Sequence, residues 1–279
     1  MRRRGSAALL AAGSLALLVP GADASTSPAT SSHPRCGEHG TVTVREIHDP
    51  AGGRREVWVY SPPGRTARTP VTYLLHGLPG TDRDFAQAGL VGELDDLLCS
   101  TRDGLVVAAP DGTTNDGRDT EWADAPDGSD DLESFVTGPL IGAVEGSARR
   151  PASLRTIGGF SMGGFAALTL ALRHRDVYGA AFGIAGYYRI DDPDHQLGTT
   201  PAAVAQHDPR ALSARARGLK VVLAEGAQEP LPLVSGEAAR FAPLLRAHGA
   251  TVTSRRVAGG HDLATLETAL PLGLALAAG

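Results

Sequence analysis

Short apolar runs alternate with helix-length segments over most of the chain. Two early stretches, 41–47 and 55–60, are β-branched or alternating, and Asp49, Pro50 and Gly52 between them favour an antiparallel hairpin. Further strands are expected at 71–75, 105–109, 153–160, 180–184, 219–224 and 251–257. Helices are expected at 82–99, 132–146, 162–174, 236–247 and after 261. This alternation predicts an α/β fold, with a mostly parallel central sheet and helices on both faces.

Two polar stretches interrupt the alternation. Residues 113–131 are rich in Asp and Gly, and residues 187–217 hold Asp191, Asp192 and Asp194 among weak helical signals. Long loops on one side of an α/β sheet commonly carry its ligand site. We therefore expect both stretches to roof an active site.

The first 24 residues have the pattern of a secretory signal peptide. Arginines at 2–4 precede an apolar run at 7–19, and a small-residue motif ends at Ala24. The run is shorter than the roughly 20 residues that span a bilayer, although a retained anchor is the alternative. We expect cleavage near Ala24 and a secreted protein, in which a flexible leader at 25–39 precedes one folded domain at 40–279.

Composition narrows the class of protein further. Of the 279 residues 42% are apolar and 20% are charged, and the net charge is -5. These values exclude a disordered chain, a collagen-like fibre and a polytopic membrane protein. Because no basic face is available for phosphate groups, we expect no nucleic-acid partner. We expect a monomer without stable membrane insertion.

Cys36 and Cys99 are the whole cysteine content. In the oxidising environment that an exported protein meets, they can form a disulfide. It would tie the N-terminal segment to the end of the first long helix, which Thr81 and Asp82 are expected to cap. Such a bridge stabilises a fold by about 3–4 kcal/mol in the chain-entropy model. Two buried thiols are the alternative.

The sequence 159–163 matches the G-x-S-x-G pattern of a serine nucleophile. It lies directly after an expected strand and directly before an expected helix, where a tight turn lifts the serine hydroxyl above the sheet edge. The turn needs small neighbours, which Gly159, Gly163 and Gly164 supply. We therefore interpret Ser161 as a nucleophile. A serine that caps the following helix is the alternative.

A serine nucleophile needs a general base, which is usually a histidine held by a carboxylate. Among nine histidines, His261 lies in a post-strand loop near the C-terminus, where two glycines precede it. It is the favoured base. His76 competes, but it ends an interior strand and precedes the loop expected to bind the oxyanion.

The loop after the strand at 219–224 offers two carboxylates for the histidine. Glu225 follows the strand at once, whereas Glu229 precedes Pro230, where the loop can turn back toward His261. We favour Glu229 and keep Glu225 as the alternative. Asp262 adjoins the histidine too closely to orient its ring, and we expect it to cap the last helix.

The oxyanion that develops during attack needs two backbone N–H donors. The N–H of Met162, at the start of the helix after the nucleophile, is one candidate. The second should come from the loop 76–80, where Pro79 has no N–H. Leu78 is therefore the favoured second donor.

Four motifs give the chain a family resemblance: 76–80, 110–112, 159–164 and 259–262. Over about residues 40–278 it resembles the esterase family of α/β-hydrolases, which includes S-formylglutathione hydrolases, feruloyl esterases and the antigen 85 mycolyltransferases. The resemblance implies an α/β-hydrolase catalytic domain with Ser161 as nucleophile and His261 as base, and Leu78 and Met162 as oxyanion donors. Many members have Asp where this chain has Glu229, although antigen 85 proteins use a glutamate.

The resemblance also bears on substrate contacts. Family members often carry a tryptophan after the Pro-Asp-Gly turn, and Trp122 is its counterpart here. We predict substrate contacts for Trp122, Tyr187 and Tyr188, with loop packing as the alternative.

No cofactor or metal is expected. An acidic loop invites a calcium interpretation through Asp111, Asn115, Asp116 and Asp119, but Gly117 stands one place late for an EF-hand.

The leading function is a secreted serine esterase that cleaves small-molecule, cell-envelope or polysaccharide esters through an acyl-enzyme on Ser161. The main alternative is an acyltransferase of the mycolyltransferase type, which passes the acyl group to a sugar hydroxyl. A non-catalytic binding protein on the same scaffold is a third hypothesis.

Overall fold

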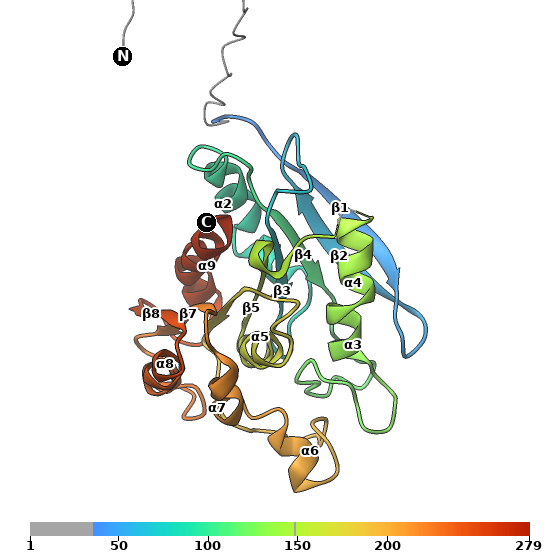
Figure 1. Ribbon diagram of the computed structural model, residues 1–279, viewed down its shortest axis with the longest axis vertical. Coiled ribbons are helices and arrows are strands. Elements are labelled where there is room, and N and C mark those ends of the chain that lie inside the picture. The colour runs from blue at the N-terminus through green and yellow to red at the C-terminus, as the bar shows by residue number, and fades with distance from the viewer. Residues whose placement is uncertain (1–35, 148) are drawn as a thin grey trace, which may run out of the picture. The chain divides into compact units, whose positions relative to one another are not determined.

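The computed structural model describes residues 36–147 and 149–279, so the expected signal peptide and most of the leader lie outside the described residues. Within them, one eight-stranded sheet has the order β1-β2-β4-β3-β5-β6-β7-β8 (Figure 1). Its strands are β1 (Thr41–His48), β2 (Arg54–Ser61), β3 (Val71–Leu75), β4 (Val106–Pro110), β5 (Arg155–Phe160), β6 (Ala180–Ile184), β7 (Lys220–Gly226) and β8 (Thr251–Val257). β1 and β2 form the predicted hairpin, β2 also runs antiparallel to β4, and the other neighbours are parallel.

Helices cover both faces of the sheet (Figure 1). They are α1 (Asp84–Gln87), α2 (Leu90–Leu97), α3 (Leu132–Thr137), α4 (Pro139–Glu145), α5 (Met162–Arg173), α6 (Pro201–Ala205), α7 (Pro209–Leu212), α8 (Glu237–Ala247) and α9 (Leu263–Ala278), with 3₁₀ turns at Ala152–Leu154 and Ser213–Arg215. Buried residues of α1, α2 and α9 share one apolar core, and those of α3, α4, α5 and α8 share the other. The α/β architecture predicted from the sequence is confirmed.

The alternation of side chains along β3 explains why two cores form. Val71, Tyr73 and Leu75 join the core under α5, whereas Leu74 joins the core under α9. Successive strand residues point to opposite faces, so a central strand covered on both sides must be apolar throughout. All five residues of β3 are buried.

Two predicted long helices are wrong, because each is broken in two. α1 and α2 are separated at Gly89, whose φ of 75° is left-handed and cannot continue a helix. α3 ends before Gly138, and Pro139 then begins α4, because proline disfavours helical geometry in the residue before it. The predicted capping by Thr81 and Asp82 is also wrong, since α1 begins after Arg83 without a side-chain cap.

The predicted disulfide between Cys36 and Cys99 is confirmed. It joins the segment before β1 to the turn after α2, across 63 residues of sequence. Asp95 strengthens the same attachment, since its carboxylate accepts hydrogen bonds from the Gly40 N–H (2.9 Å) and the Tyr60 hydroxyl (2.7 Å). The start of the domain is therefore held to α2 by covalent and polar contacts.

In the part of the chain that the structure describes, no helix combines the length and apolar character needed to cross a membrane.

Candidate active site

Ser161 occupies a sharp turn between β5 and α5. Its φ is 56°, an uncommon value for a residue with a side chain, and its own N–H donates to the Ile184 carbonyl (2.9 Å). A Cβ at Gly163 would lie 1.9 Å from the Leu75 carbonyl oxygen, and one at Gly159 would lie 2.4 Å from the backbone of Gly163. The glycines are thus required by the close approach of β3, β5 and α5 around the serine.

His261 reaches this turn from the loop between β8 and α9. Its Nε2 lies 2.8 Å from the Ser161 Oγ. Gly259, with φ of 112°, bends the loop, and the imidazole lies against the Phe160 ring with the centroids 5.0 Å apart. The structure therefore brings the predicted base to the predicted nucleophile.

Glu229 completes the arrangement on the far side of the imidazole. Its Oε2 lies 3.0 Å from the His261 Nδ1, and its Oε1 accepts the Leu231 N–H (3.0 Å). The Glu229 side chain is only 1% exposed. A carboxylate can only accept here, so Nδ1 carries the proton and Nε2 is left to accept the Ser161 hydroxyl proton.

Glu225, the alternative carboxylate, lies elsewhere. β7 extends to Gly226, two residues beyond its predicted end, so Glu225 belongs to the strand. Its buried carboxylate accepts the Ala238 N–H at the start of α8 (3.4 Å) and lies 3.7 Å from the Arg256 Nε. It has no hydrogen bond to His261 among the described residues. Asp262 caps α9 as predicted, accepting the Thr265 N–H (2.9 Å).

His76, the competing histidine, is buried, with backbone hydrogen-bond partners and with the Asp111 carboxylate 3.7 Å from its Nε2. Its Nε2 accepts the Gly112 N–H (2.8 Å), so the proton lies on Nδ1, which donates to the Gly77 carbonyl (2.8 Å). Both ring nitrogens of His76 are therefore in hydrogen bonds to groups other than Ser161. The ring ties the loop after β3 to the loop after β4.

The loop after β3 packs directly on the nucleophile turn. A Cβ at Gly77 would lie 3.0 Å from the Ser161 Cβ and 3.1 Å from the Phe160 carbonyl oxygen, so a side chain there would press on the nucleophile turn. The next residue, Leu78, and Met162 hold the two N–H groups predicted to bind an oxyanion. Within residues 36–147 and 149–279, no protein acceptor is found for either N–H group.

The aromatic residues predicted to contact substrate lie in the interior. Trp122 is fully buried, and its indole N–H donates to the His76 carbonyl (3.1 Å). Tyr187 donates its hydroxyl to Glu121 (2.7 Å) and stacks on Phe165. Burial raises the pKa of Glu121 well above its usual value.

Tyr188, the third of these aromatic residues, is also fully buried and stacks on Phe241. The contacts of Trp122, Tyr187 and Tyr188 are those of loop packing, and substrate contact by them stays a prediction.

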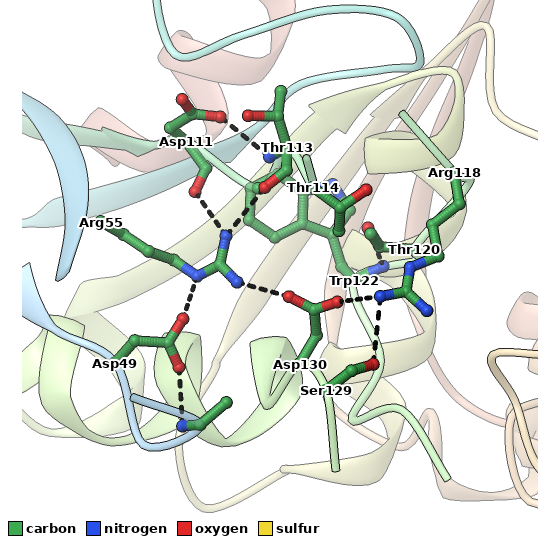
Figure 2. A network of polar contacts seen from close by, with 12 residues as sticks. Asp49, Arg55, Asp111, Thr113, Thr114, Arg118, Thr120, Trp122, Ser129 and Asp130 are labelled. Atoms are coloured by element: carbon green, nitrogen blue, oxygen red, sulfur yellow. Dashed lines mark hydrogen bonds and ion pairs between the residues drawn. The ribbon is translucent and has the colours of Figure 1, made fainter. Parts of the chain in front are cut away.

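The acidic loop after β4 is held by arginines (Figure 2). The Arg55 guanidinium pairs with Asp49 and with Asp130 (2.8 Å), and Asp130 also accepts from Arg118 (3.0 Å). Asp116 lies 3.4 Å from the same Arg118. Among the described residues, no group of three His, Cys, Asp or Glu side chains could hold a metal ion.

A cleft of about 450 Å³ opens beside the imidazole of His261. Part of its wall comes from residues that sequence reasoning missed, namely Asp84, Gln87, Leu263 and Leu266. They belong to α1 and α9, whose first turns face the loop after β3. Their proximity in sequence to the 76–80 and 259–262 motifs was the only available signal.

Comparison with known proteins places the chain in a family. A family model described as "Putative esterase" matches residues 50–275. The chain belongs to this esterase family. Its reaction class is accordingly the hydrolysis of carboxylic esters, and the resemblance seen in the sequence motifs is confirmed. A search of curated protein sequences found no match.

Solved structures agree with the esterase assignment at the level of fold. An S-formylglutathione hydrolase from Agrobacterium tumefaciens is 23% identical with a TM-score of 0.73, over 86% of this chain and 95% of that one. A ferulic acid esterase is 20% identical with a TM-score of 0.70, over 86% and 99%. Mycobacterium tuberculosis MPT51 is 18% identical with a TM-score of 0.65, over 86% and 98%. The esterase thus has the α/β-hydrolase fold.

Proposed function

We propose that this esterase hydrolyses its substrate through an acyl-enzyme on Ser161. The observation that carries the proposal is the continuous hydrogen-bonded path from the Ser161 Oγ through the His261 imidazole to the Glu229 carboxylate. In this path the Ser161 hydroxyl donates to the His261 Nε2, and the His261 Nδ1–H donates to the Glu229 carboxylate. General-base activation of a hydroxyl requires these two directions.

The reaction has two halves, acylation of Ser161 and deacylation, and both use the same three residues. Ser161 attacks the ester carbonyl while His261 Nε2 takes its proton, and the imidazolium then gives that proton to the departing alcohol. Water enters, loses a proton to the same nitrogen and attacks the acyl carbonyl. The bond from the carbonyl to the Ser161 Oγ then breaks, the imidazolium returns its proton to that oxygen, and the acid leaves. Glu229 keeps the imidazole in the required tautomer and stabilises its charged form.

The oxyanion of each tetrahedral intermediate is assigned to the N–H groups of Leu78 and Met162. Met162 follows Ser161 directly, and Leu78 follows Gly77, which packs on the Ser161 Cβ. The Met162 N–H begins a twelve-residue helix, whose N-terminal dipole favours negative charge. On other enzymes, loss of one such donor lowers kcat by about 10²–10³.

Hydrolysis is preferred over acyl transfer because the site is reachable by water. The His261 side chain is 15% exposed, and the adjoining cleft opens to the surface. Acyl transfer to a sugar hydroxyl uses the same residues, so product analysis with trehalose as acceptor separates the two. If more acylated sugar than free acid formed, acyl transfer and not hydrolysis would be the main reaction of this enzyme.

We also propose export of the esterase after cleavage near Ala24. The Cys36–Cys99 disulfide supports this, because such bridges persist in oxidising compartments. N-terminal sequencing of the protein from culture medium tests it. A start near Ser25 supports export, and intact residues 1–24 on cell-bound protein would contradict it.

The catalytic proposal is tested with a short 4-nitrophenyl ester. We expect turnover by the wild-type protein and a loss of at least about 10⁴-fold in kcat for Ser161→Ala, since the hydroxyl forms the covalent intermediate. Circular dichroism should show an unchanged fold in the variant. Equal activity of the two proteins, or none in either, would contradict the proposal.

A further inference from the structure

The cleft beside His261 adjoins the reacting atoms closely enough to select substrates. His261 and Gly77 both line it. The imidazole contacts the Ser161 hydroxyl, and Gly77 packs on the Ser161 Cβ. A group attached to either side of a bound ester carbonyl can therefore enter the cleft while the carbonyl stays at the Ser161 hydroxyl.

The walls of this cleft are largely apolar. Its apolar side chains are Leu78, Pro79, Phe160, Leu263 and Leu266. Leu78 and Leu263 are 42% and 43% exposed, which is unusual for large apolar residues in this chain. Apolar walls that remain open to solvent at a site favour an apolar ligand group, because its burial removes both surfaces from water.

The charged side chains in the cleft wall are of one sign. Asp84 and Asp262 contribute carboxylates, and among the described lining residues there is no Lys or Arg. The Thr265 and Gly260 N–H groups hold the pKa of Asp262 below its usual value, so it is ionised at neutral pH. Arg83, next to Asp84 in sequence, pairs instead with Glu56 (2.7 Å).

Resting on the proposed esterase function, we propose that the cleft binds an uncharged apolar group of the ester and that Asp84 and Asp262 exclude esters bearing a carboxylate there. An anionic group would lose hydration against apolar walls while facing two negative charges, with no lysine or arginine among the described lining residues to pair with it. Neutral apolar esters are therefore the substrate class, and the two aspartates are specificity-determining residues.

Two pairs of esters of matched shape test this proposal, because either half of the ester can enter the cleft. For the acyl half, 4-nitrophenyl hemisuccinate is compared with 4-nitrophenyl 4-methylpentanoate. For the alcohol half, the butyrate ester of 3-hydroxypropionate is compared with 3-methylbutyl butyrate, followed by pH-stat titration. The readout is the ratio of kcat/KM for the anionic ester to that for its neutral partner.

We expect this ratio, in at least one pair, to rise about threefold in Asp84→Asn and in Asp262→Asn and about tenfold in the double variant, as loss of one or two nearby unit charges predicts. Asparagine keeps the helix cap at position 262. The matched control is Asp96→Asn, an exposed residue of α2 outside the cleft, which should leave the ratio unchanged.

The two possible failures are distinguishable. Ratios that are the same in the wild-type protein and the double variant for both pairs would overturn the charge-exclusion proposal alone. Wild-type turnover of both neutral esters no faster than that of Ser161→Ala would overturn the proposed function itself. A ratio that shifts equally in Asp96→Asn would show a net-charge effect and would also overturn the specificity proposal.

Discussion

His76 and His261 follow two strands that end at the same edge of the sheet, yet their surroundings differ in kind. Both rings have both nitrogens in hydrogen bonds. Those of His76 join two backbone groups, Gly112 N–H and Gly77 C=O, whereas those of His261 join a hydroxyl and a carboxylate. Burial also separates them, because the His76 side chain is 1% exposed and the His261 side chain is 15% exposed. A histidine with backbone partners fixes loops, and one with a hydroxyl and a carboxylate can move a proton.

The largest expected effect follows from removing the proton-transfer group. His261→Ala should lower kcat for a neutral ester by about 10⁴-fold or more, because no imidazole is left to take the Ser161 proton. The loss of unfolding free energy should be limited to about 1–3 kcal/mol, because the buried Glu229 carboxylate loses its partner. Steady-state kinetics and urea curves measure the two quantities. A variant that keeps a tenth of wild-type kcat would remove His261 from the mechanism.

The two glutamates of the β7 region provide a matched pair for the next effect. Glu229→Gln should lower kcat by about 10³–10⁴-fold, because an amide cannot hold the imidazole in the required tautomer or stabilise its charge. Glu225→Gln should leave kcat within about threefold of wild type, since its carboxylate contacts Ala238 and Arg256 instead. Reversal of these two results would exchange the roles of the glutamates.

A smaller effect on catalysis is expected from His76. His76→Leu leaves the Gly112 N–H and the Gly77 carbonyl without their buried partner, which costs about 1–3 kcal/mol of unfolding free energy for each group. Displacement of the neighbouring Leu78 N–H should lower kcat by about 10–100-fold with KM little changed. His76→Gln, which restores an acceptor, should recover part of the loss. If kcat of His76→Leu fell as far as that of His261→Ala, His76 would be part of the proton path.

The smallest expected effect concerns Asp82, which follows the loop 76–80. Its Oδ2 is buried without a hydrogen-bond partner among the described residues. Burial, and after it the charges of the nearby Glu56 and Asp111, raise the pKa of Asp82 from 3.8 to about 6. The folded state thus holds a proton that the unfolded state has released, and its contribution to stability is lost as pH rises from about 4 to 6.

Asp82→Asn should therefore be more stable than the wild-type protein above pH 7, by about 1–3 kcal/mol. The advantage should shrink as pH falls from 6 to 4. Urea denaturation of both proteins at pH 4.5, 6 and 8 measures it. A stability difference that is constant over this range, or that grows toward acid, would refute the raised pKa of Asp82.

The sequence predicted those parts of the molecule that depend on local rules. Glycine placement predicts the turn at Ser161 and the loop at His261. Short apolar runs predict the strands of the central sheet. The Cys36–Cys99 pair was predictable because no other cysteine competes. The structure places the favoured Glu229 beside His261, and its role as the triad acid stays a prediction.

The remaining features depend on contacts between distant segments. β7 extends to Gly226 through pairing with β8, so Glu225 becomes a buried strand residue rather than a loop residue. Asp84 and Leu263 share a cleft only because α1 and α9 begin at the same sheet edge, and no periodicity along the chain encodes that.

Labelling with a fluorophosphonate, followed by peptide mass mapping, tests the central claim most directly. The account predicts one adduct per chain on Ser161, no adduct in Ser161→Ala, and at least about 10²-fold slower labelling in His261→Ala, because the imidazole must take the hydroxyl proton. An adduct on another residue, or labelling of Ser161 at the same rate without His261, would contradict it.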